Sequence, residues 1–258
     1  MSLKGKKIAI TGGGRGIGAA IAHELAGEGA SLLLGARTVA QVNEVAEAIR
    51  SEGGEAWAAT CDVTREEDIK AFASTAAEHL GQVDILINNA GMANSAPLKA
   101  IHLQEWNQML AVNLTGVMLC TREFLPGMVE RKWGRVVNIA SIAGVAGAAY
   151  ISAYAASKHG LMGFTRSVAA EVAKAGVTVN AVCPGYVQTD MTEKTVDRIM
   201  EKTGLPKEKA LASIETMNPQ GRIIEPDEIA YVTRMLCDDR ARGINGQGII
   251  VDGGSVLS

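Results

Sequence analysis

The chain has 258 residues, of which 47% are hydrophobic and 21% are charged, and its formal net charge is −3. This composition is ordinary for a globular protein and excludes the fibrous and disordered classes. No basic block or Lys/Arg stripe is evident, and that electrostatic footprint is what a nucleic-acid binder needs. We therefore expect no nucleic-acid partner.

The apolar runs and the reactive side chains exclude other classes. The longest apolar runs are far too short to span a bilayer, and the first residues lead into a strand-like segment without a signal-peptide pattern. We expect a cytoplasmic protein with no membrane partner. The four Cys and four His residues are widely scattered, which predicts neither a disulfide framework nor a metal site.

Short apolar runs alternate with longer amphipathic stretches along the chain. The predicted strands are KIAIT, SLLLGA, EAWAATCDV, VDILINNAG, GRVVNIAS, VTVNAVCPG and GQGIIVDGG, and the predicted helices cover residues 16–28, 39–52, 66–79, 103–131 and 154–174. Such alternation predicts a parallel sheet with helices on both faces. The expected fold is α/β, a Rossmann-type doubly wound parallel sheet of about seven strands, in a single domain covering residues 1–258.

One segment interrupts this alternation. Residues 186–222 contain no predicted strand but two charged, Met-containing helical pieces, MTEKTVDRIMEKTG and PKEKALASIETM. Long excursions between regular elements are often functional. We expect a substrate lid at about 186–222, with a decorative insertion as the alternative.

A glycine-rich loop follows the first predicted strand. Glycines stand at 12, 13, 14, 16 and 18 and lead directly into a helix. Gly12, Gly14, Gly16 and Gly18 would allow a tight turn and the close approach of a pyrophosphate to the helix N-terminus. The position between strand and helix is the context that the motif requires, so we expect a bound dinucleotide.

The end of the second strand bears on the choice of dinucleotide. It reads Gly35-Ala36-Arg37-Thr38, without the carboxylate that would bind the ribose hydroxyls of NAD. Arg37, together with Arg15 in the glycine loop, could clamp a 2′-phosphate. We expect NADP(H) to be preferred and NAD(H) to be possible; the alternative is two solvated surface arginines.

The segment YAASK places a phenol and an ammonium four residues apart. On a helix Tyr154 and Lys158 lie one above the other. With the glycine loop, NNAG at 88–91, Asn113 and Ser141, the pair follows the order and spacing of the classical short-chain dehydrogenases/reductases. The chain resembles that family along nearly its whole length.

The resemblance implies a set of functional residues. The catalytic tetrad would be Ser141, Tyr154, Lys158 and Asn113. The implied cofactor-binding residues are Gly12, Gly14, Arg15, Gly16, Ile17, Gly18, Arg37, Asp62, Val63, Asn89, Ala90, Gly91, Tyr154, Lys158, Pro184, Gly185, Val187 and Thr189. A homotetramer is also implied, with interfaces on the helices at 103–131 and 154–174.

This tetrad predicts reversible hydride transfer between a nicotinamide and a carbonyl/alcohol pair. Tyr154 would exchange the proton, with its pKa lowered by Lys158, and Ser141 would bind the carbonyl oxygen. A nucleotide-sensing protein on the same fold and a non-redox dehydratase or isomerase remain alternatives.

The substrate is predicted from the residues expected around the pocket. Met92, Ala143, Val145, Ile151, Tyr186 and Met191, with Ala93 and Ile142, are apolar or amphipathic and suit a large ketone. We expect a 3-oxoacyl thioester or a bulky cyclic or aryl ketone. The alternative is a 3-hydroxybutyrate-like hydroxy acid, whose carboxylate would need cationic partners, and here only Lys194 resembles one.

Overall fold

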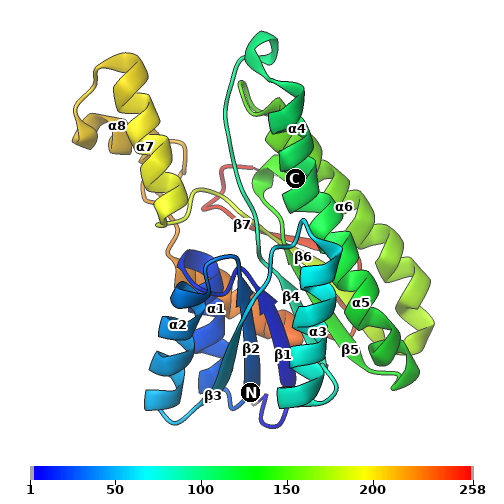
Figure 1. Ribbon diagram of the computed structural model, residues 1–258. Coiled ribbons are helices and arrows are strands. Elements are labelled where there is room, and N and C mark those ends of the chain that lie inside the picture. Colours follow the sequence, from blue (N-terminus) through cyan, green and yellow to red (C-terminus); the bar gives the residue numbers. More distant parts are fainter. Residues whose placement is uncertain (1–2, 257–258) are drawn as a thin grey trace.

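The computed structural model describes residues 3–256, and its centre is a parallel sheet of seven strands in the order β3-β2-β1-β4-β5-β6-β7 (Figure 1). The strands are β1 (Lys7–Thr11), β2 (Ser31–Ala36), β3 (Glu55–Thr60), β4 (Ile85–Asn88), β5 (Gly134–Ile139), β6 (Val177–Pro184) and β7 (Gly248–Val251). All six neighbouring pairs are parallel. The predicted fold class and number of strands are confirmed.

Helices cover both faces of the sheet. One layer contains α1 (Gly16–Gly27), α2 (Val39–Ser51) and α9 (Pro226–Cys237), and the other contains α3 (Glu66–Leu80), α5 (Gly116–Glu130) and α6 (Ser152–Val172). Each layer closes its own apolar core against one face of the sheet. A central strand is therefore buried on both sides, which explains why β5 and β6 are buried throughout.

Two helical predictions differ from the structure. The single helix expected at 103–131 is divided into α4 (Leu103–Leu110), a π-helical turn (Ala111–Thr115) and α5. Helix α9 was not predicted, although Glu225 and Glu228 form a capping box and Pro226 occupies the first turn. The remaining expected helices are present with ends shifted by a few residues.

The segment predicted as an excursion forms α7 (Asp190–Thr203) and α8 (Lys207–Glu215). These two helices pack on each other through a small apolar cluster, with Val196 and Ile214 buried, and stand away from the sheet (Figure 1). A parallel pairing of Val187 with Ile224 closes the base of the excursion. We refer to residues 190–215 as the α7–α8 segment.

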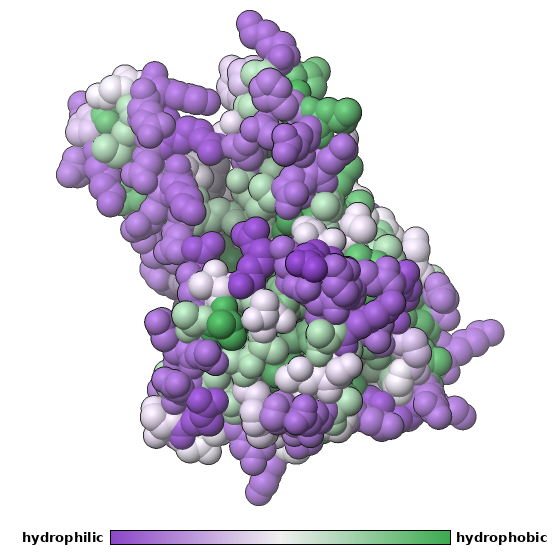
Figure 2. Space-filling view, viewed as in Figure 1, coloured by the Kyte–Doolittle hydropathy of each residue, from purple (hydrophilic) through white to green (hydrophobic). Residues whose placement is uncertain are grey.

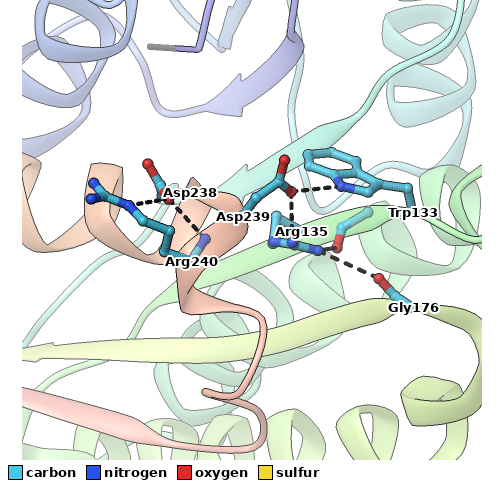
Figure 3. A network of polar contacts seen from close by, with 7 residues as sticks. Trp133, Arg135, Gly176, Asp238, Asp239 and Arg240 are labelled. Atoms are coloured by element: carbon cyan, nitrogen blue, oxygen red, sulfur yellow. Dashed lines mark hydrogen bonds and ion pairs between the residues drawn. The ribbon is translucent and has the colours of Figure 1, made fainter. Parts of the chain in front are cut away.

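A buried arginine lies near the amino edge of the sheet. Arg135, near the start of β5, has a 3%-exposed side chain and donates hydrogen bonds to Asp239 and to the carbonyl oxygens of Gly134 and Gly176 (Figure 3). Its guanidinium lies over the indole of Trp133, which donates to the same carboxylate. Burial lowers the pKa of Arg135. This cation is therefore paired within the fold and is a structural element.

The described residues were also compared with the requirements for a membrane-spanning helix, a metal site and a disulfide bond. Within residues 3–256, helices are too short or too polar to cross a membrane. Over that range His, Cys, Asp and Glu side chains also form no group of three or more that could hold a metal ion. Four cysteines at 61, 120, 183 and 237 are buried and reduced.

Candidate active site

The glycine loop lies at the carboxyl edge of the sheet, between β1 and α1. Gly12 has φ +68°, and a Cβ there would lie 2.9 Å from the Cα atom of Ala90 and 2.9 Å from Nδ2 of Asn89. A Cβ on Gly18 would overlap the carbonyl oxygen of Gly12 and the same amide. Both positions thus exclude any side chain, and the N-terminus of α1 stays open to an anionic group.

Asn89 fastens this loop to the neighbouring strand. Its side-chain amide donates to the carbonyl oxygens of Gly12 (2.8 Å) and Thr11 (3.3 Å). The Thr11 hydroxyl accepts from the backbone N–H groups of Asn89 and Ala90, at 3.2 Å each. Asn89 and Thr11 therefore join the start of the glycine loop to the end of β4.

The two arginines predicted to clamp a phosphate are separately engaged. Arg15 forms a 3.0 Å ion pair with Asp190, and both side chains are more than half exposed. Arg37 is exposed at the end of β2 and close enough to influence Asp62. Burial alone raises the pKa of Asp62, but hydrogen bonds from Thr64 and the nearby guanidinium groups lower it overall. Val63 beside it is buried against Gly116.

Asn113 lies in the π-helical turn and is fully buried. Its amide donates to the carbonyl oxygen of Met92 (2.8 Å) and to the Ser157 hydroxyl (3.0 Å), while its oxygen accepts from the N–H of Met92 (2.9 Å). Ser157 in turn donates to the carbonyl oxygen of Tyr154 (2.7 Å). Asn113 therefore joins the loop after β4 to the helix that carries Tyr154.

Ser141 and Tyr154 come together from β5 and α6. Ser141 follows β5 and caps a 3₁₀ turn by accepting from the N–H of Ala143 at 3.1 Å. The Ser141 side chain also lies close enough to the Tyr154 phenol to lower its pKa by hydrogen bonding. Burial raises the pKa of Tyr154 and outweighs the lowering effect of that bond. This direction is opposite to the one expected from the sequence.

Lys158 is 5% exposed and does not bond the phenol of Tyr154. Its ammonium donates to the carbonyl oxygen of Ile139 at 2.8 Å and lies 5.9 Å from the centre of the Tyr154 ring. Burial lowers the pKa of Lys158 to about 8, because the charged form loses its hydration. The lysine therefore lies near the tyrosine ring and loses its proton at a lower pH than an exposed lysine does.

The residues after β6 complete the edge of the sheet. Pro184 ends β6, and the N–H of Gly185 donates to the carbonyl oxygen of Val251 at 3.0 Å. Val187 is buried, and the Thr189 hydroxyl donates to its carbonyl oxygen at 3.2 Å. Thr189 is also the N-cap of α7, and its methyl group lies beside Gly16. This stretch therefore borders the glycine loop.

The residues predicted to line the substrate pocket come from three segments. Met92, Val145 and Ile151 are half-buried and Ala143 is buried, whereas Tyr186 and Met191 are 39% and 44% exposed. The N–H of Ala96 donates to the carbonyl oxygen of Tyr150 at 2.8 Å, which holds the loops after β4 and β5 together. These loops form one wall of a hollow, and the α7–α8 segment forms the other (Figure 2).

Two polar contacts hold the α7–α8 segment in place. Asp190 at its start forms the ion pair with Arg15 of the glycine loop, and Arg198 donates a 3.0 Å hydrogen bond to the Ser95 hydroxyl in the loop after β4. Four residues that take part in these contacts and in those of Asn113 were not identified from the sequence: Ser95, Ser157, Asp190 and Arg198. No local pattern marks Asp190 or Arg198, because their partners Arg15 and Ser95 lie 175 and 103 positions away in the sequence.

The sheet order, the glycine loop and the polar groups at its edge define a Rossmann-type α/β protein. The chain belongs to the short chain dehydrogenase family, whose model matches residues 6–199. It is therefore an oxidoreductase of the class that acts on CH–OH groups with NAD(P)(H). The resemblance stated from the sequence is confirmed.

Similar proteins cover the whole chain but differ in substrate. The 3-oxoacyl-(acyl-carrier-protein) reductase FabG of Pseudomonas aeruginosa is 37% identical over 258 residues, 100% of both chains. The D-beta-hydroxybutyrate dehydrogenase of Cupriavidus necator is 36% identical over 255 residues, 98% of this chain and 99% of its own. A crystal structure of an actinorhodin polyketide ketoreductase variant with NADPH superposes with a TM-score of 0.94 at 35% identity, covering 99% of each chain.

Proposed function

We propose that the protein is an NADPH-dependent reductase of a 3-oxoacyl thioester or a comparably bulky cyclic or aryl ketone. The observation that supports this proposal best is the convergence of Ser141, Tyr154 and Lys158 beside the glycine loop, with Asn113 bonded to the loop above them. Residues 186–222 act as the substrate lid of a single catalytic domain.

Each member of this tetrad has its own task. Ser141 donates a hydrogen bond to the substrate oxygen and stabilises the charge that develops there. Tyr154 donates a proton to that oxygen in reduction and accepts it in oxidation. Lys158 holds the proton next in line, since its pKa of about 8 allows it to gain or lose one near neutrality. Asn113 positions Met92 and the turn of α6 on which Tyr154 stands.

The chain's own groups fit a nicotinamide dinucleotide. The N-terminus of α1, where the N-cap residue Arg15 makes no side-chain capping hydrogen bond, would receive the pyrophosphate. When bound, the nicotinamide supplies or accepts the hydride. A positive charge on a bound oxidised nicotinamide would favour the phenolate form of Tyr154 and so act against the effect of burial, which raises the pKa of this residue.

A preference for NADP(H) rests on charge. Arg37 is exposed at the end of β2, where no carboxylate is present to bind a ribose hydroxyl. Arg15 forms an exposed ion pair, and such pairs contribute only about 0–1 kcal/mol. Arg15 can therefore leave Asp190 at little cost and turn to a 2′-phosphate.

The apolar character of the pocket supports the larger substrates. Ala93, Ala143 and Ile151 carry no group that could pair with a small carboxylate. The alternative, a 3-hydroxybutyrate-like dehydrogenase, is supported by the relative from Cupriavidus necator. Parallel kcat/KM measurements with acetoacetate, an acetoacetyl thioester and a bulky uncharged ketone, each with NADPH and NADH, test the proposal. A strong preference for acetoacetate would overturn the substrate assignment, and no cofactor oxidation with a broad ketone panel would overturn the reductase.

We also propose a homotetramer with interfaces on α4, α5 and α6. Leu103 at the start of α4 is 73% exposed and Val129 in α5 is 36% exposed, which would suit a subunit interface. Light scattering is the test, and a mass equal to the 27.0 kDa chain would refute the assembly.

A further inference from the structure

Four buried polar side chains form a continuous row of hydrogen bonds across one face of the sheet. Asn88 of β4 donates to the Thr121 hydroxyl of α5 at 3.1 Å and to the side-chain oxygen of Asn138 of β5 at 2.9 Å. Asn138 in turn donates to the Thr165 hydroxyl of α6 at 2.9 Å. All four residues are at most 2% exposed. Helices α5 and α6 lie side by side over this face (Figure 1). We call these four residues the polar bridge.

The pairing of the strands places the two asparagines together. Asn88 and Asn138 are partners in the parallel pairing of β4 with β5, so their side chains leave the same face of the sheet. A buried amide is costly unless its hydrogen bonds are made. Each asparagine therefore requires a polar partner on the helix that covers it, at one particular position along that helix.

Helix α6 has polar contacts with β5 at two positions. Thr165 accepts from Asn138, and the ammonium of Lys158 donates to the carbonyl oxygen of the next strand residue, Ile139, at 2.8 Å. Lys158 and Thr165 are seven residues apart, so they leave the helix within about 20° of each other and about 10 Å apart along it. One face of α6 is thus fixed on the strand that leads into Ser141.

The hydrogen bond between Asn138 and Thr165 is directional. The Thr165 hydroxyl donates its single proton to the carbonyl oxygen of Leu161 at 2.8 Å, so towards Asn138 it can only accept. Leu161 and Met162 also belong to a buried apolar cluster between α6 and the sheet. Apolar burial is non-directional, whereas a hydrogen bond weakens steeply when its length or angle changes. The polar contact therefore resists a sliding of α6 that the apolar contacts would tolerate.

A displacement of α6 would reach the reacting groups directly. The backbone of Gly144, in the turn that Ser141 caps, is so close to α6 that a Cβ there would lie 2.9 Å from the carbonyl oxygen of Lys158. Tyr154 stands one turn before Lys158 on the same helix. Misplacing a reacting group by about 1 Å can cost about a hundredfold in rate. The position of α6 on β5 therefore determines whether these groups act together.

We propose that Asn138 and Thr165 are positioning residues of the active site, whose hydrogen bond fixes α6 on β5 so that Tyr154 and Lys158 meet Ser141. The inference rests on the proposed roles of these three residues in hydride transfer. Asn138 and Thr165 act through the helix and not on the substrate. The other end of the polar bridge holds α5, which carries no member of the tetrad.

The first test makes the same substitution at the two ends of the polar bridge. Thr165→Val and Thr121→Val each replace a buried hydroxyl with a methyl group, and in the second variant Asn88 keeps its bond to Asn138. The substrate is the ketone that the wild type reduces fastest. Thr165→Val should lower kcat by about ten- to a hundredfold and leave KM for NADPH within about threefold. Thr121→Val should lower the midpoint of urea unfolding but keep kcat within about threefold of the wild type.

Two further variants separate positioning from loss of stability. Thr165→Ser keeps the hydroxyl and loses the methyl group, so it should lower the unfolding midpoint while kcat stays close to that of the wild type. Asn138→Ala removes the same hydrogen bond from the strand, and Asn88 and Thr165 each retain a second partner, Thr121 and Leu161. It should slow turnover as much as Thr165→Val does, and the double variant should be no slower than either, because one interaction is lost in all three.

Two results would overturn the inference. In the first, the loss of kcat follows the unfolding midpoint in every variant, Thr165→Ser and Thr121→Val included, and the polar bridge then only stabilises the fold. In the second, kcat is unchanged in both Thr165→Val and Asn138→Ala.

The second test does not require turnover. In protein labelled with ¹³C in its lysine side chains, the Cε resonance of Lys158 is identified by its absence from Lys158→Met. Thr165→Val and Asn138→Ala should displace this resonance at neutral pH, and Thr121→Val should not. If the wild type reduces no ketone but the resonance responds in this way, the proposed function is wrong and the positioning stands. If ketones are reduced but the resonance responds to none of the variants, the positioning is wrong and the function stands.

Discussion

Replacing Lys158 with methionine should stabilise the cofactor-free protein while abolishing its activity. Burial lowers the pKa of this lysine from 10.5 to about 8, a difference equivalent to roughly 3 kcal/mol. Below pH 8 both the folded and the unfolded chain hold the proton, so the full cost of burying the cation opposes folding. Between pH 8 and 10.5 the unfolded chain binds more protons, and the stability of the wild type rises with pH.

The measurement is urea unfolding of wild type and Lys158→Met at several pH values. The advantage of the variant should be greatest near pH 7 and should shrink by about 2 kcal/mol by pH 9.5. Loss of the hydrogen bond to the carbonyl oxygen of Ile139 reduces the advantage of the variant at every pH. Lys209→Met, at an exposed position, should show no such trend. A difference between wild type and Lys158→Met that stays constant with pH would refute the reasoning.

Three further predictions concern the cofactor and the proton. Tyr154→Phe should reduce kcat by about 10²–10⁴-fold, since it deletes the proton donor. Cofactor affinity, measured by fluorescence titration, should stay within a few fold of the wild-type value. Near-normal turnover would show that another group supplies the proton. Arg37→Asp should lower kcat/KM for NADPH relative to NADH. If the wild-type enzyme already has a higher kcat/KM with NADH, Arg37 does not select NADPH and the prediction is wrong. Gly18→Ala should weaken cofactor binding and lower the unfolding temperature, because the methyl group overlaps Gly12 and Asn89, whereas Gly27→Ala in the same helix meets nothing within 4 Å and should not.

The parts of the site that are local in sequence could be predicted. The glycine loop and the Tyr154/Lys158 spacing each depend on one element, and the parallel sheet with helices on both faces follows from the alternating pattern. The partner of Lys158 could not be predicted, because Ile139 is on another strand and offers only a backbone oxygen. The raised pKa of Tyr154 depends on burial by several segments. For the same reason the contact of Arg15 with Asp190, 175 positions apart, is invisible before folding.

The two arginines of the predicted phosphate clamp also show that contacts between distant segments could not be predicted from the sequence. Arg15 and Arg37 were predicted as a pair from their positions after successive strands. In the structure Arg15 faces the lid, and Arg37 lies beside Asp62. The missed helix α9 is a different case, because its capping box at Glu225 and Glu228 is written in the sequence. The capping box therefore made the start of α9 predictable from the sequence, although the helix was not predicted.

The π-helical turn at Ala111–Thr115 makes the spacing between α4 and α5 a fixed quantity. A turn of this kind holds one residue more than an α-helical turn. Deleting a single residue there would let the two helices fuse into one regular helix and would rotate α4 by about 100° relative to α5. Asn113 would then lose Met92 or Ser157, since it cannot face both from a regular helix. In this part of the chain, homologous proteins and engineered variants should therefore accept substitutions far more readily than insertions or deletions.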